Sequence, residues 1–346
     1  MSTTRTASRT LSHVLVVTLR GLALSLPLIL PVFMTGTAFA QALDIPAILD
    51  LDRKMPPTGA IVQYGHQFKV DVENDGTKIS KNNASLALAH RAKLSEDTAL
   101  LVVGTYALQA YDFSGGRSTT PPVNYYQWDD VHRLVLIGLV GHDLNDEWRL
   151  IGGGVFRSWG EGGADYGDSI TGGLLGGFDY HPDEDFSIGL LIGAVSALES
   201  SVGILPVPTL KWTFAENWRL NVGVISAQAD PGIGAEVTWQ VRDNFAVGAG
   251  ATYLNRRYRL KDKTRVPNGS NPSRPNRNDG GGIGQETELP IFALVRWKPT
   301  LKTAIDLQGG VAVAGNVRVE DSDGGRIKDD NYDPAPFVAL KGTIFF

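Results

Sequence analysis

Five histidines are the first candidates for metal binding or acid–base chemistry in this sequence: His66, His90, His132, His142 and His181. A helical zinc site pairs two histidines four residues apart, because that spacing places both rings on one face of the helix. No two of these histidines have that spacing. We therefore expect no metal site and no cofactor, and histidines that lie at the membrane interface or in the lumen.

A second candidate is the tetrapeptide Gly167-Asp168-Ser169-Ile170, which resembles the Gly-Asp-Ser-Leu block of a serine esterase family. That mechanism needs a histidine as general base, and the resemblance implies one near the C-terminus. The last histidine is His181, so this partner is missing. The tetrapeptide is more simply interpreted as a loop that enters a strand, and we predict that the protein is not an enzyme.

Two charged segments lie near the C-terminal end of the chain. The first is basic and consists of Arg256, Arg257, Arg259, Lys261, Lys263 and Arg265. The second is acidic and consists of Glu320, Asp321, Asp323, Asp329, Asp330 and Asp333. The basic segment is either a solvated loop or a site for lipopolysaccharide phosphates, by charge attraction, and pairing between the two segments is a further alternative. The fragment Asp321-Ser322-Asp323-Gly324 lacks the remaining ligands of a calcium loop.

The N-terminal residues have the features of an export signal. Arg5, Arg9 and Arg20 are the only charged residues before Asp44, an apolar run follows, and Ala38-Phe39-Ala40 matches the small-x-small cleavage pattern. We predict a signal peptide over residues 1–40 and a short periplasmic leader over residues 41–58. Removing the three arginines changes the formal charge from −5 to −8, which argues against nucleic acid as a partner.

The remainder of the chain alternates between apolar and polar residues with a period of two. In residues 232–241, for example, Ile233, Ala235 and Val237 share one face, whereas Glu236 and Thr238 share the other. Such alternation predicts strands with one apolar face. No apolar run after Ala40 reaches 18 residues, so membrane-spanning helices are excluded.

Connection lengths and aromatic positions distinguish a membrane barrel from a soluble sandwich. Short turns are expected at 95–98, 143–146, 182–185, 215–217, 242–244 and 298–301, and long polar segments at 114–128, 159–168, 259–284 and 319–334. Aromatic residues flank the short turns: Trp148, Phe186, Trp212, Trp218, Trp239, Phe245 and Trp297. Short turns at one end, long loops at the other and an aromatic girdle are typical of an outer-membrane barrel.

The alternation predicts an all-β fold, a transmembrane antiparallel up-and-down barrel over residues 59–346. It contains about fourteen strands, at 59–72, 84–94, 98–112, 130–142, 147–158, 169–181, 186–198, 204–214, 217–227, 231–241, 244–258, 286–297, 301–315 and 335–346. An even number lets the barrel close with both termini in the periplasm. Closure matters because an open sheet edge in lipid leaves unpaired amides, each of which costs several kcal/mol.

The last strand ends in an assembly signal. Phe346, Ile344, Leu340 and Val338 lie on one face at alternate positions, and this arrangement resembles the C-terminal signal of bacterial outer-membrane barrels. By overall layout, residues 59–346 are similar to uncharacterised porin-like barrels of the Gram-negative outer membrane. The resemblance implies assembly by periplasmic chaperones and the β-barrel assembly machinery, with outer-membrane lipid and lipopolysaccharide as surroundings.

The polar faces of the predicted strands carry charges of both signs. We expect the following side chains to face the barrel lumen: Lys69, Asp71, Arg91, Arg149, Asp179, Lys211, Arg219, Glu236, Arg296, Asp306 and Lys341. The excess of bases indicates a polar pore with a mild preference for anions. Ion pairs that hold the barrel together are the alternative interpretation, because buried charges need partners.

Two functions follow from this reading. The first is a passive outer-membrane channel for small hydrophilic solutes. The second is a non-conducting structural or binding barrel that displays its loops to lipopolysaccharide or to an external partner. A continuous water path through the lumen favours the first function, and a plugged lumen favours the second.

Overall fold

The computed structural model describes residues 57–73, 76–115, 126, 128–198, 202–261, 281–321 and 324–346. The predicted signal peptide and nearly all of the predicted leader therefore lie outside the described residues. Among the described residues, no helix is long and apolar enough to cross a membrane.

The described chain is almost entirely strand, with one short 3₁₀ turn, η2 (Gly167–Ser169). The strands are β1 (Thr58–Asp71), β2 (Thr77–Lys93), β3 (Thr98–Gly115), β4 (Asp130–Asp143), β5 (Trp148–Glu161), β6 (Ile170–Tyr180), β7 (Phe186–Ser196), β8 (Val202–Ala215), β9 (Trp218–Ala227), β10 (Asp230–Arg242), β11 (Phe245–Arg259), β12 (Ile283–Thr300), β13 (Thr303–Glu320), β14 (Arg326–Tyr332) and β15 (Ala335–Phe345).

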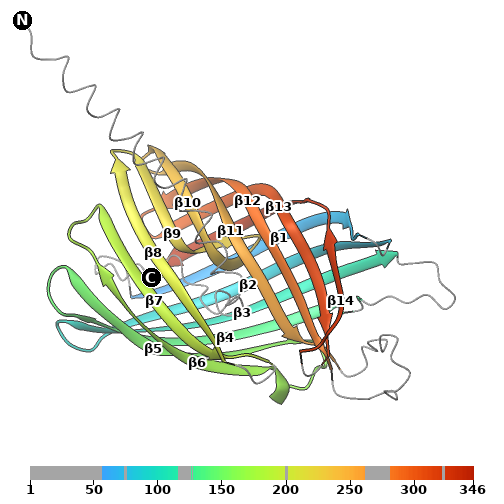
Figure 1. Ribbon diagram of the computed structural model, residues 1–346. Helices are drawn as coiled ribbons and strands as arrows, with labels where there is room; N and C mark the ends of the chain where they lie inside the picture. Colours follow the sequence, from blue (N-terminus) through green and yellow to red (C-terminus); the bar gives the residue numbers. More distant parts are fainter. Residues whose placement is uncertain are drawn as a thin grey trace, which may run out of the picture. The chain divides into compact units, whose positions relative to one another are not determined.

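These strands form one closed antiparallel barrel (Figure 1). Each strand from β1 to β13 pairs with the next along the chain, β13 also pairs with β15, and β1 pairs with β15 to close the wall. Strands β14 and β15 both pair with β13, and only Asp333 and Pro334 separate them, so they are two segments of a single wall strand. The predicted fourteen-stranded barrel is thereby confirmed.

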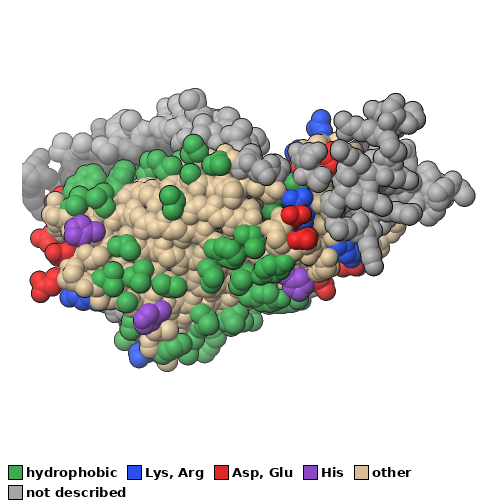
Figure 2. Space-filling model, turned by 90° about the horizontal axis from the view of Figure 1, so that it is seen from below, with side chains coloured by type: hydrophobic (Ala, Val, Ile, Leu, Met, Phe, Trp, Pro, Cys, Tyr) green, Lys and Arg blue, Asp and Glu red, His purple; other side chains and the backbone are tan. Residues whose placement is uncertain are grey.

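The outer surface of the barrel is apolar between its two ends. Alternate residues point outward, and many of them are large and about half exposed, including Val62, Leu88, Leu136, Ile192 and Leu340. Figure 2 shows one such face, where groups of hydrophobic side chains are spread over the middle and charged residues gather toward the ends. This belt matches the hydrocarbon layer of a membrane, which requires backbone pairing inside the wall and apolar groups outside it.

The predicted aromatic girdle is present at the short-turn end. The exposed fractions of Trp148, Trp212, Trp218, Trp239 and Trp297 all lie between 36% and 48%, which places their rings at the outer surface. The rings of Trp218 and Trp239 stack, with centroids 5.9 Å apart. An amphipathic ring at the boundary between hydrocarbon and water is favourable, so the girdle marks one membrane interface.

The largest differences between the predicted and observed strand boundaries lie at the long-loop end. Strand β2 begins at Thr77 rather than residue 84. The predicted polar segment 319–334 is mostly strand, because β13 continues to Glu320 and β14 occupies Arg326–Tyr332. Cross-strand polar contacts stabilise this extension, such as the Arg318–Asp329 ion pair at 3.0 Å. A run of charged residues predicts a loop, but opposite charges on facing strands also stabilise a sheet.

The interior of the barrel is layered along its axis, and it is less polar than the sequence predicts. An apolar cluster faces inward from strands β1 to β9 and includes Ile61, Val103, Ile137, Leu191 and Val207. A second buried cluster, rich in aromatic rings, includes Tyr111, Trp128, Trp159, Tyr258 and Tyr332. The side chains of both clusters point away from lipid. Alternation therefore predicts correctly which residues face inward, but it does not predict that much of the inner face is apolar.

The β9–β10 hairpin leaves the wall and enters the lumen. Beyond Leu210 and Val222, strand β9 no longer pairs with β8, and Gly223 has φ = +139°, a conformation that favours glycine. Gln228 and Ala229 form the turn with positive φ, which is typical of two-residue hairpin turns. We call residues 223–232 the hairpin tip. All ten of these residues are buried, whereas Ile233, the next residue, is half-buried.

Candidate functional site

A cavity of about 650 Å³ lies inside the barrel and reaches its short-turn end. We call it the chamber. Its lining includes Asn244 of the β10–β11 turn and Leu301 of the β12–β13 turn, and strands β5 to β10, β12, β13 and β15 contribute the rest. The chamber is thus enclosed by most of the wall and by the base of the hairpin.

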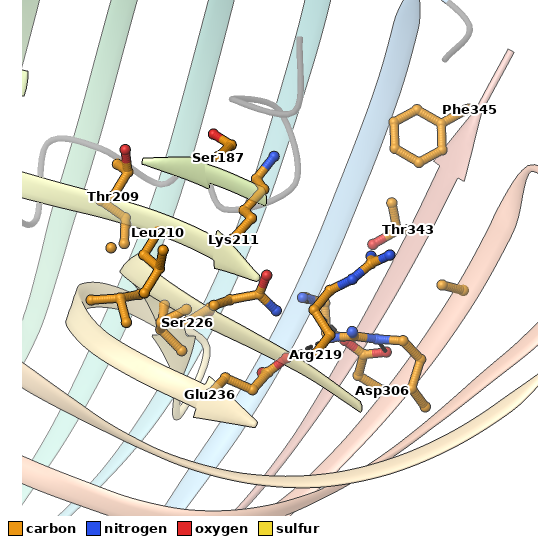
Figure 3. A pocket seen from close by; sticks show the side chains of 18 of the residues that line it. Ser187, Thr209, Leu210, Lys211, Arg219, Ser226, Glu236, Asp306, Thr343 and Phe345 are labelled. Carbon is orange, nitrogen blue, oxygen red and sulfur yellow. Dashed lines mark hydrogen bonds and ion pairs between the residues drawn. The ribbon is translucent and has the colours of Figure 1, made fainter. Parts of the chain in front are cut away.

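Most of the predicted lumen charges line this chamber. They are Arg149, Asp179, Lys211, Arg219, Glu236, Arg296, Asp306 and Lys341. Figure 3 shows Lys211, Arg219, Glu236 and Asp306 projecting into the same space from different strands. Successive residues of a strand face opposite sides of the wall. Each of these charged residues lies on the inward face of its strand, and the strands of a closed barrel share one interior.

Ion pairs hold several of these charges in place. The guanidinium of Arg296 donates two hydrogen bonds to Asp306, at 2.8 and 2.9 Å, and Lys341 lies 3.1 Å from the same carboxylate. Arg149 pairs with Asp143 at 2.5 Å. Asp179 accepts a hydrogen bond from Ser187 at 2.7 Å. The bidentate pairing of Arg296 with Asp306 fixes the geometry of both side chains.

Bases nevertheless outnumber acids around the chamber. Seven lining residues are Lys or Arg, and four are Asp or Glu. Among the described residues, Arg219 forms no ion pair with a carboxylate, and its side chain lines the chamber near Lys298. An excess of one charge sign in a space enclosed by protein raises the local concentration of the opposite ion.

Three of the predicted lumen charges lie elsewhere. Lys69 pairs with Asp112 at 2.7 Å, and Asp71 pairs with Lys78 at 3.2 Å; all four side chains are at least 41% exposed. The cause is an irregularity in the β1–β2 register between Gln67 and Val70, since a one-residue slip reverses the faces of a strand. Arg91 is half-buried on the inward face of β2, which it shares with Ala87 and Ala89.

The hairpin tip crosses the lumen from one side of the wall to the other. Val224 packs into the apolar cluster of β1 to β8, whereas Ile225 and Ala227 pack against Phe292 of β12 and Phe337 of β15. Asn83 of β2 donates a hydrogen bond of 2.9 Å to the carbonyl of Gln228. Gln63 of β1 accepts one of 2.6 Å from the Ser226 hydroxyl.

A charged network anchors the end of the tip. The carboxylate of Asp230 pairs with Arg133 of β4 at 2.5 Å and with Arg256 of β11. Arg256 in turn binds Glu286 and Glu288, and Lys81 lies 2.7 Å from each of these glutamates. Each of the six side chains is at most 1% exposed. Three cations face three anions, so the network is neutral overall, as burial of charge requires.

Sequence reasoning did not identify this network. Arg256 and Arg257 fall within the predicted strand 244–258, and the structure extends this strand, β11, to Arg259; their interpretation as part of a basic segment entering a loop did not indicate their buried partners. Arg257 pairs with Glu320 at 2.5 Å, which confirms pairing between the basic and acidic segments at this position. Lys263, Arg265 and Asp323 lie outside the described residues.

The histidines and the Gly167–Ile170 tetrapeptide were the other candidates for chemistry, and the contacts they make are with neighbouring strands and turns. His66, His90, His132 and His142 each contact an oxygen of a neighbouring strand, at 2.7 to 2.9 Å. The described residues contain no cluster of metal-ligating side chains. Ser169 is buried, and its hydroxyl donates to the backbone carbonyl of Asp165, so the Gly167–Ile170 tetrapeptide is a turn that leads into β6.

No family model and no curated protein matches the chain. Among solved structures it is similar to an outer membrane channel from Pseudomonas putida F1, with 14% identity, 84% of this chain and 96% of that chain covered, and a TM-score of 0.43. A Pseudomonas aeruginosa FadL homologue shares 11% identity over 90% and 97% of the two chains, with a TM-score of 0.48. The Pseudomonas putida toluene transporter TodX shares 9% identity over 90% and 96%, with a TM-score of 0.45.

These likenesses are too distant to assign a solute to this chain. What the molecule itself shows is a closed antiparallel wall, an apolar outer belt and an aromatic girdle next to short turns. These are the features that the outer membrane requires of a protein that spans it. The chain is an outer-membrane β-barrel of porin-like architecture.

Proposed function

We propose that the protein is an outer-membrane channel for small solutes, with a mild preference for anions. The observation that carries the proposal is the chamber, a cavity of about 650 Å³ inside the barrel with seven basic and four acidic residues in its lining. A protein that served only as a scaffold has no need for a cavity that is lined by charged side chains and reaches one end of the barrel. An uncompensated cation such as Arg219 attracts an anionic solute from the short-turn end.

The position of the hairpin tip sets a condition on this function. In the structure the tip crosses the lumen beyond the chamber and is held by buried hydrogen bonds and ion pairs. A solute that traverses the barrel along its axis requires the tip to move aside. We therefore propose a channel that rests in a closed state and conducts when the hairpin tip leaves the middle of the lumen.

The reversal potential across a salt gradient in a planar bilayer tests the anion preference. We expect wild type to select anions and the double variant Arg149→Gln with Arg219→Gln to lose most of this selectivity. The preference should also weaken with salt, since the Debye length falls from ~10 Å at 0.1 M to ~3 Å at 1 M. The control variant, Lys78→Gln with Arg326→Gln, removes two charges that are mostly exposed outside the chamber and should retain the wild-type reversal potential.

A second function is favoured by the same hairpin tip. A barrel whose lumen is permanently crossed by a buried hairpin is a non-conducting structural or binding protein, and its loops then carry the function. Absence of conductance from protein shown to be folded, in wild type and in a variant that displaces the tip, would establish this second function. Conductance without any anion preference would refute only the selectivity.

A further inference from the structure

Three side chains of the barrel wall bind one carboxylate of the hairpin tip. Asp230 contacts Arg133 of β4 at 2.5 Å, the Nε atom of Arg256 on β11, and the amide nitrogen of Gln109 on β3 at 3.1 Å. Each of the four side chains is at most 1% exposed. The donors belong to the wall and only the acceptor belongs to the tip, so the wall itself contains a binding site for a carboxylate.

This site offers more hydrogen-bond donors than Asp230 uses. The guanidinium of Arg133 donates to Asp230 through Nη1, while its Nε and Nη2 atoms, like Nη2 of Arg256, have no hydrogen-bond partner among the described residues. The ring of Trp159 lies 5.1 Å from the guanidinium carbon of Arg133, a cation–π contact that helps to fix its position. Buried donors are normally paired, and a guanidinium can bind a carboxylate through two parallel hydrogen bonds. A carboxylate that is not tied to the hairpin can use the donors that Asp230 leaves free.

Departure of the hairpin tip removes one anion from the buried charge network. With Asp230 in place, three cations face three carboxylates; without it, the same three cations face two. An uncompensated buried charge is strongly unfavourable, and a solute anion that takes the position of Asp230 restores the balance. Such an anion binds the state in which the tip has left and not the state in which the tip occupies the site, so it shifts the equilibrium toward the open channel.

The surroundings of this site are polar as well as charged. The carboxamides of Gln228, two residues before Asp230, and of Gln67, which lies opposite Lys81 in the β1–β2 ladder, are each 1% exposed. Among the described residues, neither carboxamide has a hydrogen-bond partner. Hydroxyl groups of a solute can pair with buried amides, whereas an apolar chain leaves them unpaired at a cost. A small hydrophilic carboxylate therefore fits the site better than an apolar acid of the same size.

We infer that Gln109, Arg133 and Arg256 form a binding site for the carboxylate of a small hydrophilic solute, and that Asp230 occupies this site while the hairpin tip crosses the lumen. The solute replaces Asp230 and thereby favours the open channel. This inference rests on the proposed function, because a solute reaches the site along the lumen. It adds the chemical class of the solute and the means by which the solute opens the channel.

The first test is chemical rescue of a variant that lacks the carboxylate. Asp230→Ala leaves a space of the size of formate between the donors of the wall. The stability of this variant is measured by denaturant titration at constant ionic strength and neutral pH, with sodium formate replacing sodium chloride. Asp230→Asn is the first control, because it keeps the volume of the side chain and leaves no space for formate. Asp112→Ala is the second, because it removes the carboxylate of an exposed ion pair with Lys69.

We expect formate to stabilise Asp230→Ala relative to chloride, and to have no such effect on wild type, Asp230→Asn or Asp112→Ala. A ligand that binds only the folded state, at ten times its dissociation constant, raises the ratio of folded to unfolded protein about tenfold. The ratio for Asp230→Ala should rise with the formate concentration to that extent. The same stability of folded Asp230→Ala in formate and in chloride overturns the carboxylate site.

The second test uses wild type, so it does not depend on the folding of a variant. Its open probability in a planar bilayer is compared in glycolate, propionate and chloride at equal concentration and neutral pH. Glycolate and propionate are both monocarboxylates with the same number of non-hydrogen atoms, but only glycolate has a hydroxyl group. We expect glycolate to raise the open probability above its value in chloride, and propionate to raise it less. Equal open probabilities in glycolate and propionate overturn the preference for a hydrophilic solute.

The outcomes separate the inference from the proposed function. Formate rescue of Asp230→Ala without any conductance from folded wild type supports the carboxylate site and refutes the channel. Conductance of wild type without formate rescue of folded Asp230→Ala overturns the site and leaves the channel intact. An open probability that is the same in glycolate and in chloride overturns the replacement of Asp230 by the solute, and this comparison decides alone if Asp230→Ala does not fold.

Discussion

Asp230 and Arg133 form an ion pair across the lumen, with 2.5 Å between carboxylate and guanidinium. Asp230 lies at the end of the hairpin tip and Arg133 on β4, a strand that is not a neighbour of β9 or β10 in the sheet. The pair thus joins an element that has left the wall to the far side of the barrel. Both side chains are at most 1% exposed, so water does not weaken the contact as it does at a surface.

The first prediction concerns the position of the hairpin tip. A Cβ atom at Gly65 would lie 2.5 Å from the carbonyl oxygen of Gln228, which is backbone and cannot rotate aside. We expect Gly65→Ala to displace the tip and raise the fraction of time that the barrel conducts, at a stability cost of about 1–3 kcal/mol from overpacking. The measurement is the open probability in a planar bilayer.

Gly138→Ala is the control for this substitution, because a Cβ at Gly138 meets nothing within 4 Å. It should leave both open probability and stability at wild-type values. If Gly65→Ala also leaves both unchanged, the tip does not rest against Gly65 in the membrane.

The second prediction concerns the buried charge network. Lys81 contacts Glu286 and Glu288, and its removal leaves two buried carboxylates with too few cations. Breaking a buried ion pair on one side typically costs about 3–5 kcal/mol, so we expect Lys81→Met to lower the free energy of unfolding by that amount in a denaturant titration.

Lys78→Met serves as the reference for Lys81→Met, since Lys78 lies on the same strand but is 52% exposed in its pair with Asp71. Loss of an exposed pair costs about 0–1 kcal/mol. Similar losses for the two variants would show that the network around Lys81 is hydrated in the membrane.

The third prediction concerns which face of β10 meets lipid. Val237 pairs with Leu220 of β9 and Ala249 of β11, whereas Thr238 is 8% exposed on the inner side. Arginine facing the middle of the bilayer costs about 2–4 kcal/mol. We therefore expect Val237→Arg to destabilise the barrel more than Thr238→Arg in a denaturant titration, and equal losses would contradict this register.

The fourth prediction concerns assembly. The amide of Phe346 donates to the carbonyl of Thr58 at 3.0 Å, where the last and first strands meet. We expect deletion of Phe346 to leave unfolded protein in the periplasm, measured as loss of the heat-modifiable form on electrophoresis. Normal amounts of membrane-inserted barrel after the deletion would show that closure does not depend on this residue.

Alternation was sufficient to predict the barrel and the inward direction of most of the charged side chains that line the chamber. A strand has only two faces, so the period-two pattern placed Arg219 and Glu236 on the inner side along with Asp306 and Lys341. The same logic failed for Lys69 and Asp71, because the irregularity after Gln67 reverses the faces and leaves no sign in the pattern of polar residues.

The hairpin tip was not predicted, although part of its signal is present in the sequence. Pro206 and Pro208 lie two residues apart in β8, and this spacing removes two donors from one edge and identifies an unpaired edge. The contact between Asp230 and Arg133 left no such signal, since the two residues are 97 positions apart. Only the bend at Gly223 brings Asp230 into the lumen.

The most direct test of the account is single-channel recording of refolded wild type beside Gly65→Ala in a planar bilayer. The account predicts rare openings in wild type, frequent openings of the same anion preference in Gly65→Ala, and no added conductance in Gly138→Ala. Protein that is fully heat-modifiable, and therefore folded, but shows no openings in either wild type or Gly65→Ala would contradict the channel.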